Sequence, residues 1–168
     1  AGMLRIVFGL GTRAVNRVEN DYPRIVALDA PLVKPYTRQA DIRRFSQNEV
    51  DVLNLKDNSF QSLPATQLLT ENIEKHVGMI ASRDRAAIEY LQSLGRQGVE
   101  AWILTFDELL GGTSFARIMS NMLKKLEQVY RYPVDIEFTV NFNDSGLPRI
   151  NLLQCRPFQT KGHYSRVD

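Results

Sequence analysis

The chain contains 168 residues, of which 43% are hydrophobic and 24% are charged, and its formal net charge is +2. This composition predicts one ordinary domain, or a large piece of one, with enough apolar residues to form a core. The basic residues are scattered and the charge is nearly balanced, so we expect no nucleic-acid partner. No apolar run approaches the roughly 18 residues of a membrane helix, so we expect no membrane partner either.

The cysteine content and the beginning of the chain bear on its setting. Cys155 has no second cysteine with which to form a disulfide inside the chain, which favours a reducing, cytoplasmic compartment. The chain begins at Ala1 and Gly2 and runs directly into a predicted strand. We therefore interpret it as part of a longer polypeptide.

A glycine turn follows the first predicted strand, Leu4 to Phe8. Gly9 and Gly11 fit the spacing G-x-G-x-x-A, and Asp29 follows where a dinucleotide-binding fingerprint places its acidic residue. One interpretation is therefore an NAD-binding Rossmann fragment. Against it, the Asp-Tyr-Pro sequence at 21–23 leaves room only for a short helix, and no second strand-helix-strand unit follows. The other interpretation is a turn in which the backbone closely approaches a ligand or a neighbouring strand.

Short strands and a weak helix are predicted next, and we interpret the strands as a peripheral sheet. The helix is expected from Pro64 to Val77, with Leu68, Leu69 and Ile73 at helical spacing. The strand candidates are 25–28, 50–55 and 59–62, and turn residues occupy 56–58.

Two firmer helices and a strand are predicted in the second half. Apolar spacing predicts a helix over 84–94, which Gly95 ends. Val99 to Phe106 is apolar on both faces and predicts a central buried strand. Thr113 or Ser114 is expected to cap a second helix, whose wide apolar stripe predicts packing against the core. The stripe consists of Phe115, Ile118, Met119, Met122, Leu126 and Val129.

Two strand-like runs around a Ser-Gly break predict an antiparallel hairpin from Val134 to Pro157. With Ser145 and Gly146 as the two turn residues, the register places Glu137 opposite Gln154. Alternation then separates a polar face from an apolar face. The polar face carries Asp135, Glu137, Thr139, Gln154 and Arg156, and the apolar face carries Ile136, Phe138, Val140, Phe142, Leu153 and Cys155.

The polar face combines a carboxylate, a carboxamide and a guanidinium, which suits a magnesium-nucleotide. Mg²⁺ takes one or two protein oxygens and leaves its other positions to water and phosphate, and Arg binds phosphate through paired N–H groups. Glu137 and Gln154 would hold the metal, and Arg156 would hold a phosphate. The alternative is an ordinary solvent-facing strand pair, in which Asp135 and Arg156 form an ion pair of little energetic value.

Three strings carry a resemblance to a known family. DIEF at 135–138 and LLQCRP at 152–157 resemble the closing motif of the ATP-grasp-type nucleotide-binding domain of phosphoenolpyruvate synthase and pyruvate phosphate dikinase. VFGLGTRAVNRVENDYPR at 7–24 resembles the glycine segment of the same domain. In that family the glutamate and glutamine ligate Mg²⁺ and the arginine contacts the ATP phosphates, which implies these roles for Glu137, Gln154 and a catalytic Arg156.

The resemblance implies an α+β, ATP-grasp-like subdomain with a mostly antiparallel sheet packed against helices. Residues 1–157 would form the C-terminal part of the domain, and 158–168 the start of an interdomain linker. The parent enzyme would use ATP to phosphorylate a histidine on another domain and pass the phosphate to pyruvate. Its partners would be the N-terminal ATP-grasp half and the phosphohistidine domain, and this chain alone would be inactive. A non-catalytic interaction or regulatory module on the same fold is the other expectation.

Overall fold

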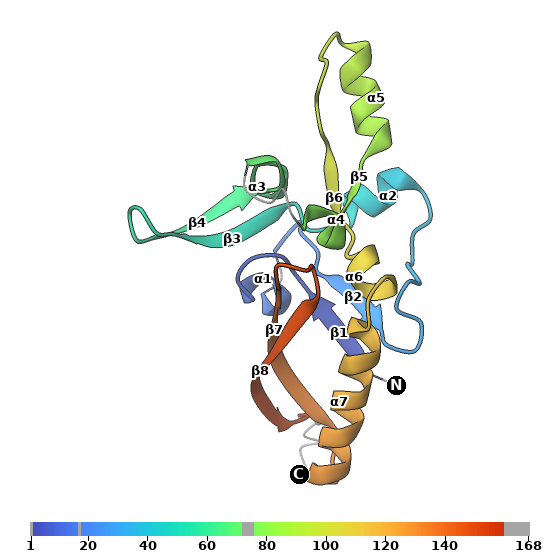
Figure 1. Cartoon of the computed structure of the whole chain (residues 1–168), viewed down its shortest axis with the longest axis vertical. Helices are drawn as coiled ribbons and strands as arrows, with labels where there is room; N and C mark the ends of the chain where they lie inside the picture. Colours follow the sequence, from blue (N-terminus) through green and yellow to red (C-terminus); the bar gives the residue numbers. More distant parts are fainter. Residues whose placement is uncertain (1, 17, 72–75, 160–168) are drawn as a thin grey trace, which may run out of the picture.

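The computed structural model of the chain describes residues 2–16, 18–71 and 76–159. The fold belongs to the α+β class, and in this part of the chain the strands form four two-stranded antiparallel sheets among helices. Figure 1 shows an elongated molecule with two arms, one at an end and one at the side. None of the described helices has the length and apolarity required to span a bilayer.

The first sheet pairs β1 (Met3–Ile6) with β2 (Arg24–Ala27), and Leu4, Ile6 and Val26 turn toward the core. Only one helical turn, α1 (Thr12–Val15), follows the glycines before the chain returns. A Rossmann unit needs a crossover helix between parallel strands, whereas β2 runs antiparallel to β1. The predicted NAD-binding alternative is therefore wrong.

The side arm is the hairpin of β3 (Glu49–Asn54) and β4 (Ser59–Pro64), which projects from the body in Figure 1. This confirms the predicted strands and their turn, where Asn58 adopts φ 53°. A short helix that the sequence did not indicate, α2 (Gln39–Arg44), precedes the arm.

The predicted helix from Pro64 to Val77 is shorter than expected. It is observed as α3 (Ala65–Glu71), and the predicted position Ile73 lies outside the described residues. Val77 instead begins the separate single turn α4 (Val77–Ile80).

The end arm consists of β5 (Ala81–Arg83), α5 (Arg85–Ser93) and the chain returning to β6 (Trp102–Leu104), as Figure 1 shows. The Asp84 carboxylate accepts the Ala87 N–H at 3.1 Å, which caps the predicted helix. The predicted central strand was wrong: β6 has three residues and pairs only with β5 among the described strands. Its apolar residues instead meet the core, where Ile103 and Leu104 are buried.

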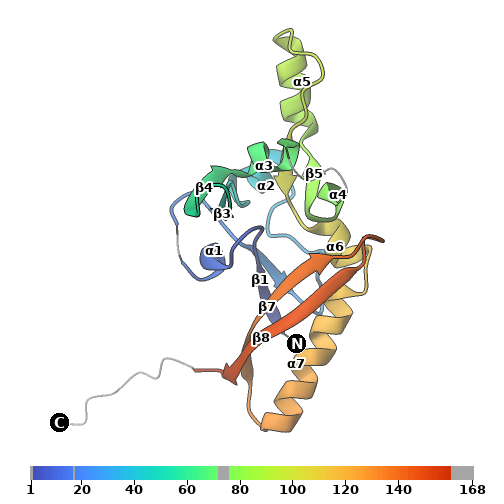
Figure 2. The ribbon, with the colours of Figure 1, turned by 60° about the vertical axis from the view of Figure 1, so that its left-hand side comes forward.

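The long helix α7 (Phe115–Tyr130) follows the short α6 (Asp107–Gly111) and lies along the hairpin of β7 (Val134–Phe142) and β8 (Pro148–Pro157), as Figures 1 and 2 show. Phe115 and Met119 are fully buried, and the rings of Phe115 and Phe138 lie 6.2 Å apart. The predicted packing of this helix against the core is confirmed, and the apolar face of the hairpin packs against the same core. Two predicted stripe residues, Ile118 and Val129, are exposed, whereas Leu123 packs against the core.

Candidate functional site

The open end of the β7–β8 hairpin brings the predicted ligands together. Glu137 pairs with Gln154, and Asp135 pairs with Arg156 one pleat away. Residues directly opposite each other in an antiparallel pair have Cβ atoms roughly 5 Å apart. The predicted register at this end is therefore confirmed, and the carboxylate, the carboxamide and the guanidinium share one face.

The hairpin differs from the prediction in the length of its loop and in one extra residue in β8, and the effects of these two differences on the register cancel at the open end. The loop contains three residues, Asp144–Gly146, because Asn143 N–H donates to Leu147 O at 3.1 Å and Phe142 pairs with Pro148. A register shift after Glu137 then leaves Leu153 as an extra residue in β8.

The shift changes which residues of β8 face the core. Leu153 is 63% exposed, so its predicted place on the apolar face is wrong. Ile150, opposite Val140, packs against the core, and Leu152, opposite Phe138, shares that face but is 43% exposed. Because the extra residue precedes Gln154, the pairs at the open end keep their predicted faces.

The Arg156 guanidinium is oriented by its neighbour across the strands. Its Nε and Nη2 both donate to Asp135 Oδ2, at 3.0 and 2.8 Å. Both side chains are about half exposed, so the pair contributes little to stability. Guanidinium carries five N–H donors, so this contact fixes the plane of Arg156 and leaves donors for an anion.

The side chains of Glu137 and Gln154 suit a hard cation such as Mg²⁺. Both are exposed, and neither forms a hydrogen bond or an ion pair with the described residues. Mg²⁺ prefers oxygen ligands and needs only one or two from the protein, the remainder coming from water and phosphate. The described residues contain no group of three or more His, Cys, Asp or Glu side chains that could hold a metal, so a cation at the hairpin would take one carboxylate and one amide oxygen from this chain.

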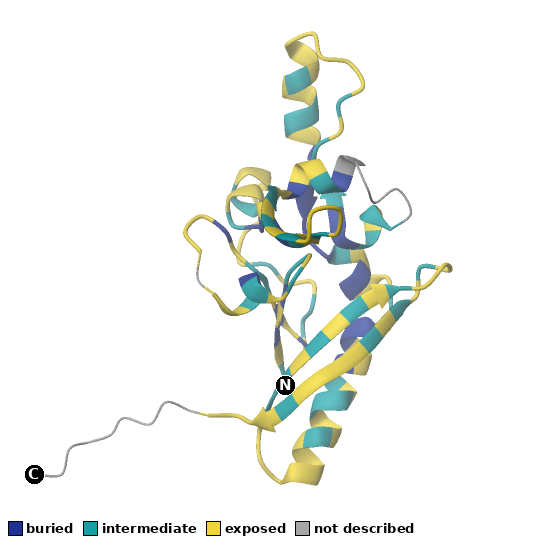
Figure 3. Ribbon diagram, turned by 90° about the vertical axis from the view of Figure 1, so that its left-hand side faces the viewer, coloured by how far each residue is buried: buried dark blue, intermediate teal, exposed yellow. Residues whose placement is uncertain are grey.

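Figure 3 shows the hairpin with exposed residues on both strands: exposed and half-buried residues alternate from Ile136 to the end of β7, and β8 has a run of exposed residues from Asn151 to Gln154. The apolar side chains on its other face, including Ile136, Phe138 and Val140, pack against the core. A rigid core thus supports one side of the hairpin and leaves its polar side available for a ligand.

The glycine turn carries a second charged cluster, which is internal. Arg13 is 7% exposed, and it donates to Asp21 at 2.6 Å, to Asp51 at 2.9 Å and to Glu49 at 3.0 Å. A fourth hydrogen bond reaches Ser62 at 3.2 Å. Arg13 therefore joins the turn to the base of the β3–β4 arm and does not face an external anion.

The contacts within this cluster shift the pKa values of Asp51 and Arg13. Burial alone would raise the pKa of Asp51, but hydrogen bonds from Ser62, Thr12 and Arg13 hold that pKa below its ordinary value. Burial alone would lower the pKa of Arg13, but its hydrogen bonds to Asp21 and Asp51 raise it. The folded state thus favours the charged form of both partners.

The backbone conformation and the close surroundings of residue 9 explain why this position requires a glycine. Its φ is +89°, and a Cβ there would lie 2.4 Å from Val50 Cγ1 and 2.7 Å from Asp51 O. The turn thus lets the backbone approach strand β3 closely, and Leu10 N–H donates to Asp51 O at 2.9 Å. Gly11 has open space around it, and Asp29, the acidic residue of the dinucleotide alternative, is exposed.

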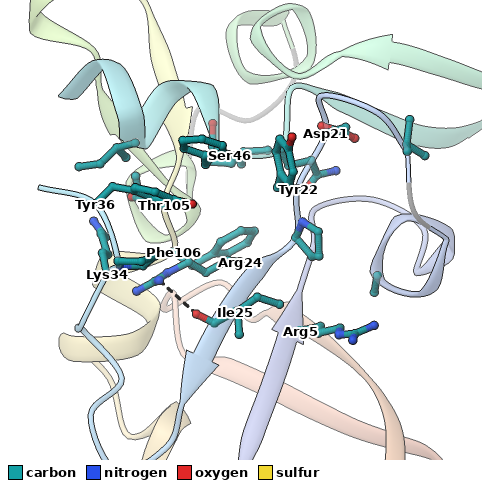
Figure 4. A pocket seen from close by; sticks show the side chains of 18 of the residues that line it. Arg5, Asp21, Tyr22, Arg24, Ile25, Lys34, Tyr36, Ser46, Thr105 and Phe106 are labelled. Atoms are coloured by element: carbon teal, nitrogen blue, oxygen red, sulfur yellow. Dashed lines mark hydrogen bonds between the residues drawn. The ribbon is translucent and has the colours of Figure 1, made fainter. Parts of the chain in front are cut away.

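A pocket of about 530 Å³ lies away from the hairpin face, between β2, α2 and the residues after β6 (Figure 4). Neither Glu137, Gln154 nor Arg156 lines it. Its residues come from positions 5 to 106 in the chain, so local sequence patterns gave no signal for it.

A family model described as pyruvate phosphate dikinase, AMP/ATP-binding domain, matches residues 1–167. The chain belongs to this family. Comparisons with curated proteins and with solved structures found no match. The resemblance drawn from the glycine segment and the closing hairpin is therefore confirmed, and membership of the dikinase family identifies the chain as an AMP/ATP-binding domain.

Proposed function

We propose that this chain supplies the magnesium and phosphate ligands of an ATP-dependent phosphotransferase of the dikinase family. Glu137 and Gln154 hold the metal, and Arg156 holds a phosphate of ATP. The observation that supports this most directly is the register of the hairpin, which pairs the carboxylate with the carboxamide and sets the guanidinium on the same exposed face.

The three side chains divide the work by their chemistry. Bound Mg²⁺ would neutralise charge on the polyphosphate. The Glu137 carboxylate and the Gln154 amide oxygen act as hard oxygen ligands and set where the metal lies. Arg156 offers N–H donors in a fixed plane, which orients a phosphate and stabilises charge as the phosphoryl group leaves. Asp135 positions Arg156 through its paired hydrogen bonds.

The domain context is part of the same proposal. Residues 1–157 form the C-terminal part of an ATP-grasp-type domain, and 158–168 begin a linker to the next domain. The phosphoryl group passes to a histidine on another domain and from there to pyruvate, in the cytoplasm. The remainder of the ATP site comes from an N-terminal half, so the chain alone does not catalyse the reaction.

The test is phosphohistidine formation from ATP by the full-length polypeptide. Glu137→Gln and Arg156→Ala should each reduce its rate by about a hundredfold or more, since the first removes the charged ligand of the metal and the second removes the donor to the phosphate. Arg149→Ala is the matched control, because Arg149 is also exposed and lies nearer the tip of the same hairpin. Transfer to pyruvate from an already phosphorylated histidine should be unchanged in every variant.

Wild-type rates in either site variant would contradict the assignment. Absence of magnesium-dependent ATP binding in the wild-type protein would instead favour a non-catalytic interaction or regulatory module on the same fold.

A further inference from the structure

The pocket between β2, α2 and the residues after β6 has the properties of a ligand site. Its volume, about 530 Å³, lies within the range of small-molecule pockets, which are mostly apolar with a few fixed polar groups. Ile25, Ile42, Phe45 and Phe106 form part of its apolar wall. Arg24 also lines the pocket, near Ile25 and Phe106 (Figure 4). None of these residues belongs to the hairpin site.

Arg24 is a half-buried cation that has no carboxylate partner among the described residues. Its Nη1 donates to Ile25 O at 3.1 Å, and its Nη2 donates to Pro31 O at 3.3 Å and to Val33 O at 3.2 Å. Its Nε is buried and has no hydrogen-bond partner in the described structure. The hydrogen bonds of the Arg24 guanidinium go only to neutral carbonyls, and the nearby Asp107 carboxylate, which is already paired with Lys34, compensates its positive charge only in part.

The other charged groups around the pocket do not cancel this charge. Lys34 is neutralised by Asp107 at 2.5 Å, and Asp21 is neutralised by Arg13 at 2.6 Å. Arg5 also lines the pocket and has no ion-pair partner in the described part of the chain. The charged residues that line the pocket therefore carry a net positive charge, to which Arg24 contributes.

An aromatic wall stands beside Arg24. The rings of Tyr36 and Phe45 are stacked with centroids 4.3 Å apart and planes 14° apart, and Tyr22 meets Phe45 edge-on at 5.5 Å. Tyr22 and Tyr36 remain more than a third exposed, although both line the pocket. Such a wall offers ring contacts to a flat aromatic group.

The backbone of the pocket wall is strained at Phe106. Phe106 is 2% exposed and adopts φ 58°, ψ 19°, the left-handed conformation that a bulky residue rarely takes. Its N–H donates to Ile80 O at 2.9 Å, which helps to hold this conformation. Strain of this kind is concentrated at ligand sites in proteins.

We propose that this pocket binds a small anion that carries a flat aromatic ring, with the anionic group near Arg24 and the ring against Tyr36 and Phe45. The chemical class includes a nucleoside monophosphate and an aromatic carboxylate. This site is separate from the proposed magnesium site, and binding there requires no metal.

The test measures binding to the 168-residue chain by calorimetry in EDTA, with two matched pairs of probes. AMP is compared with adenosine, and indole-3-acetate with indole-3-acetamide. At least one anion should bind about tenfold or more tightly than its neutral partner, as a charge-assisted contact predicts. The anion that binds identifies the source of the ligand as nucleotide or carboxylate.

Variants locate the site. Arg24→Gln should weaken anion binding by about tenfold or more, and Tyr36→Leu by about three- to tenfold. Arg85→Gln and Tyr90→Leu are matched controls on exposed positions of α5 and should bind like wild type. Thermal unfolding of each variant shows whether it is folded, and Tyr36→Leu serves as the test if Arg24→Gln is not.

Three results would overturn the proposal: no binding of either anion, equal binding of an anion and its neutral partner, or binding that Tyr36→Leu leaves unchanged. Arg156→Ala should leave binding in EDTA intact, since Arg156 is the hairpin group proposed to hold a phosphate and needs no metal to do so. If Arg156→Ala alone abolished binding, the probe would occupy the hairpin site and the pocket proposal would fail, whereas the proposed magnesium site would be unaffected.

Discussion

Replacing Arg13 tests how the glycine turn is held to the β3–β4 arm. In Arg13→Leu, the buried carboxylates of Asp21 and Asp51 lose their counter-charge, with side chains only 5% and 8% exposed. Removing one partner of a buried ion pair costs about 3–5 kcal/mol. The bridge to Glu49, which is 53% exposed, adds at most about 1 kcal/mol. We therefore expect the free energy of unfolding to fall by about 3–5 kcal/mol at pH 7.

The assay is urea unfolding followed by the fluorescence of Trp102, the single tryptophan. Domains of this kind are stable by about 5–15 kcal/mol, so the loss is large enough to measure and can prevent folding. Arg13→Lys is the milder variant, because it keeps the positive charge but loses the planar set of N–H donors that contacts several carboxylates at once. It should lower the free energy of unfolding by about 1–3 kcal/mol. Arg38→Leu is the control, because Arg38 forms an ion pair with Asp41 while its side chain is 86% exposed.

The pH dependence of the stability is a second test of the Arg13 cluster. The pKa of Asp51 is lower in the folded state, so its stabilising contribution is complete above the unfolded-state pKa of about 3.9. That contribution is lost as the pH falls through the folded-state value. In Arg13→Leu the Asp51 carboxylate loses the Arg13 contacts that lower its pKa, while burial still raises it, so the difference in stability between variant and wild type should narrow as the pH falls from 7 to 4.5. A loss no larger than that of Arg38→Leu would refute the reasoning.

Three further substitutions test the turn and the core. Gly9→Ala should destabilise the fold by more than about 1 kcal/mol in the same urea assay, because φ is +89° and the new Cβ would collide with Val50 and the Asp51 backbone. Gly11 has open space around it, so Gly11→Ala should stay within about 1 kcal/mol of wild type. Equal effects of the two would contradict the close approach. Met119→Ala should cost about 2–5 kcal/mol, since Met119 is fully buried; a smaller loss in urea unfolding would mean that the α7 interface is not tightly packed.

Periodicity predicted those parts of the fold in which one face of an element is buried. The α7 stripe and the paired strands of the arm and the hairpin were found in this way. The strand predicted from Val99 to Phe106 failed because its apolar residues are buried by the core around them and not by strands on both sides. Short elements such as α2 and β5 carry too few residues for a period to appear.

The strand pairing at the open end of the hairpin was predicted correctly, but the pairing between that end and the turn was not. Counting by twos from the turn cannot reveal the extra residue at Leu153, and the three-residue loop offset it. The partners of Arg13 were beyond sequence reasoning, since its Nε meets Asp51 38 residues away. The same limit applies to the pocket around Arg24, whose lining comes from several separate segments.

The most direct test of the hairpin site is metal-nucleotide binding by the full-length polypeptide. Mn²⁺ replaces Mg²⁺, and electron paramagnetic resonance measures how much of the Mn²⁺ is bound in the presence of ATP. Glu137→Gln should weaken binding by at least about tenfold, since even outer-shell partners of a metal cost 10–100-fold when mutated. Glu127→Gln, on an exposed position of α7, should bind like wild type. Equal Mn²⁺-ATP binding by Glu137→Gln and wild type would contradict the central claim.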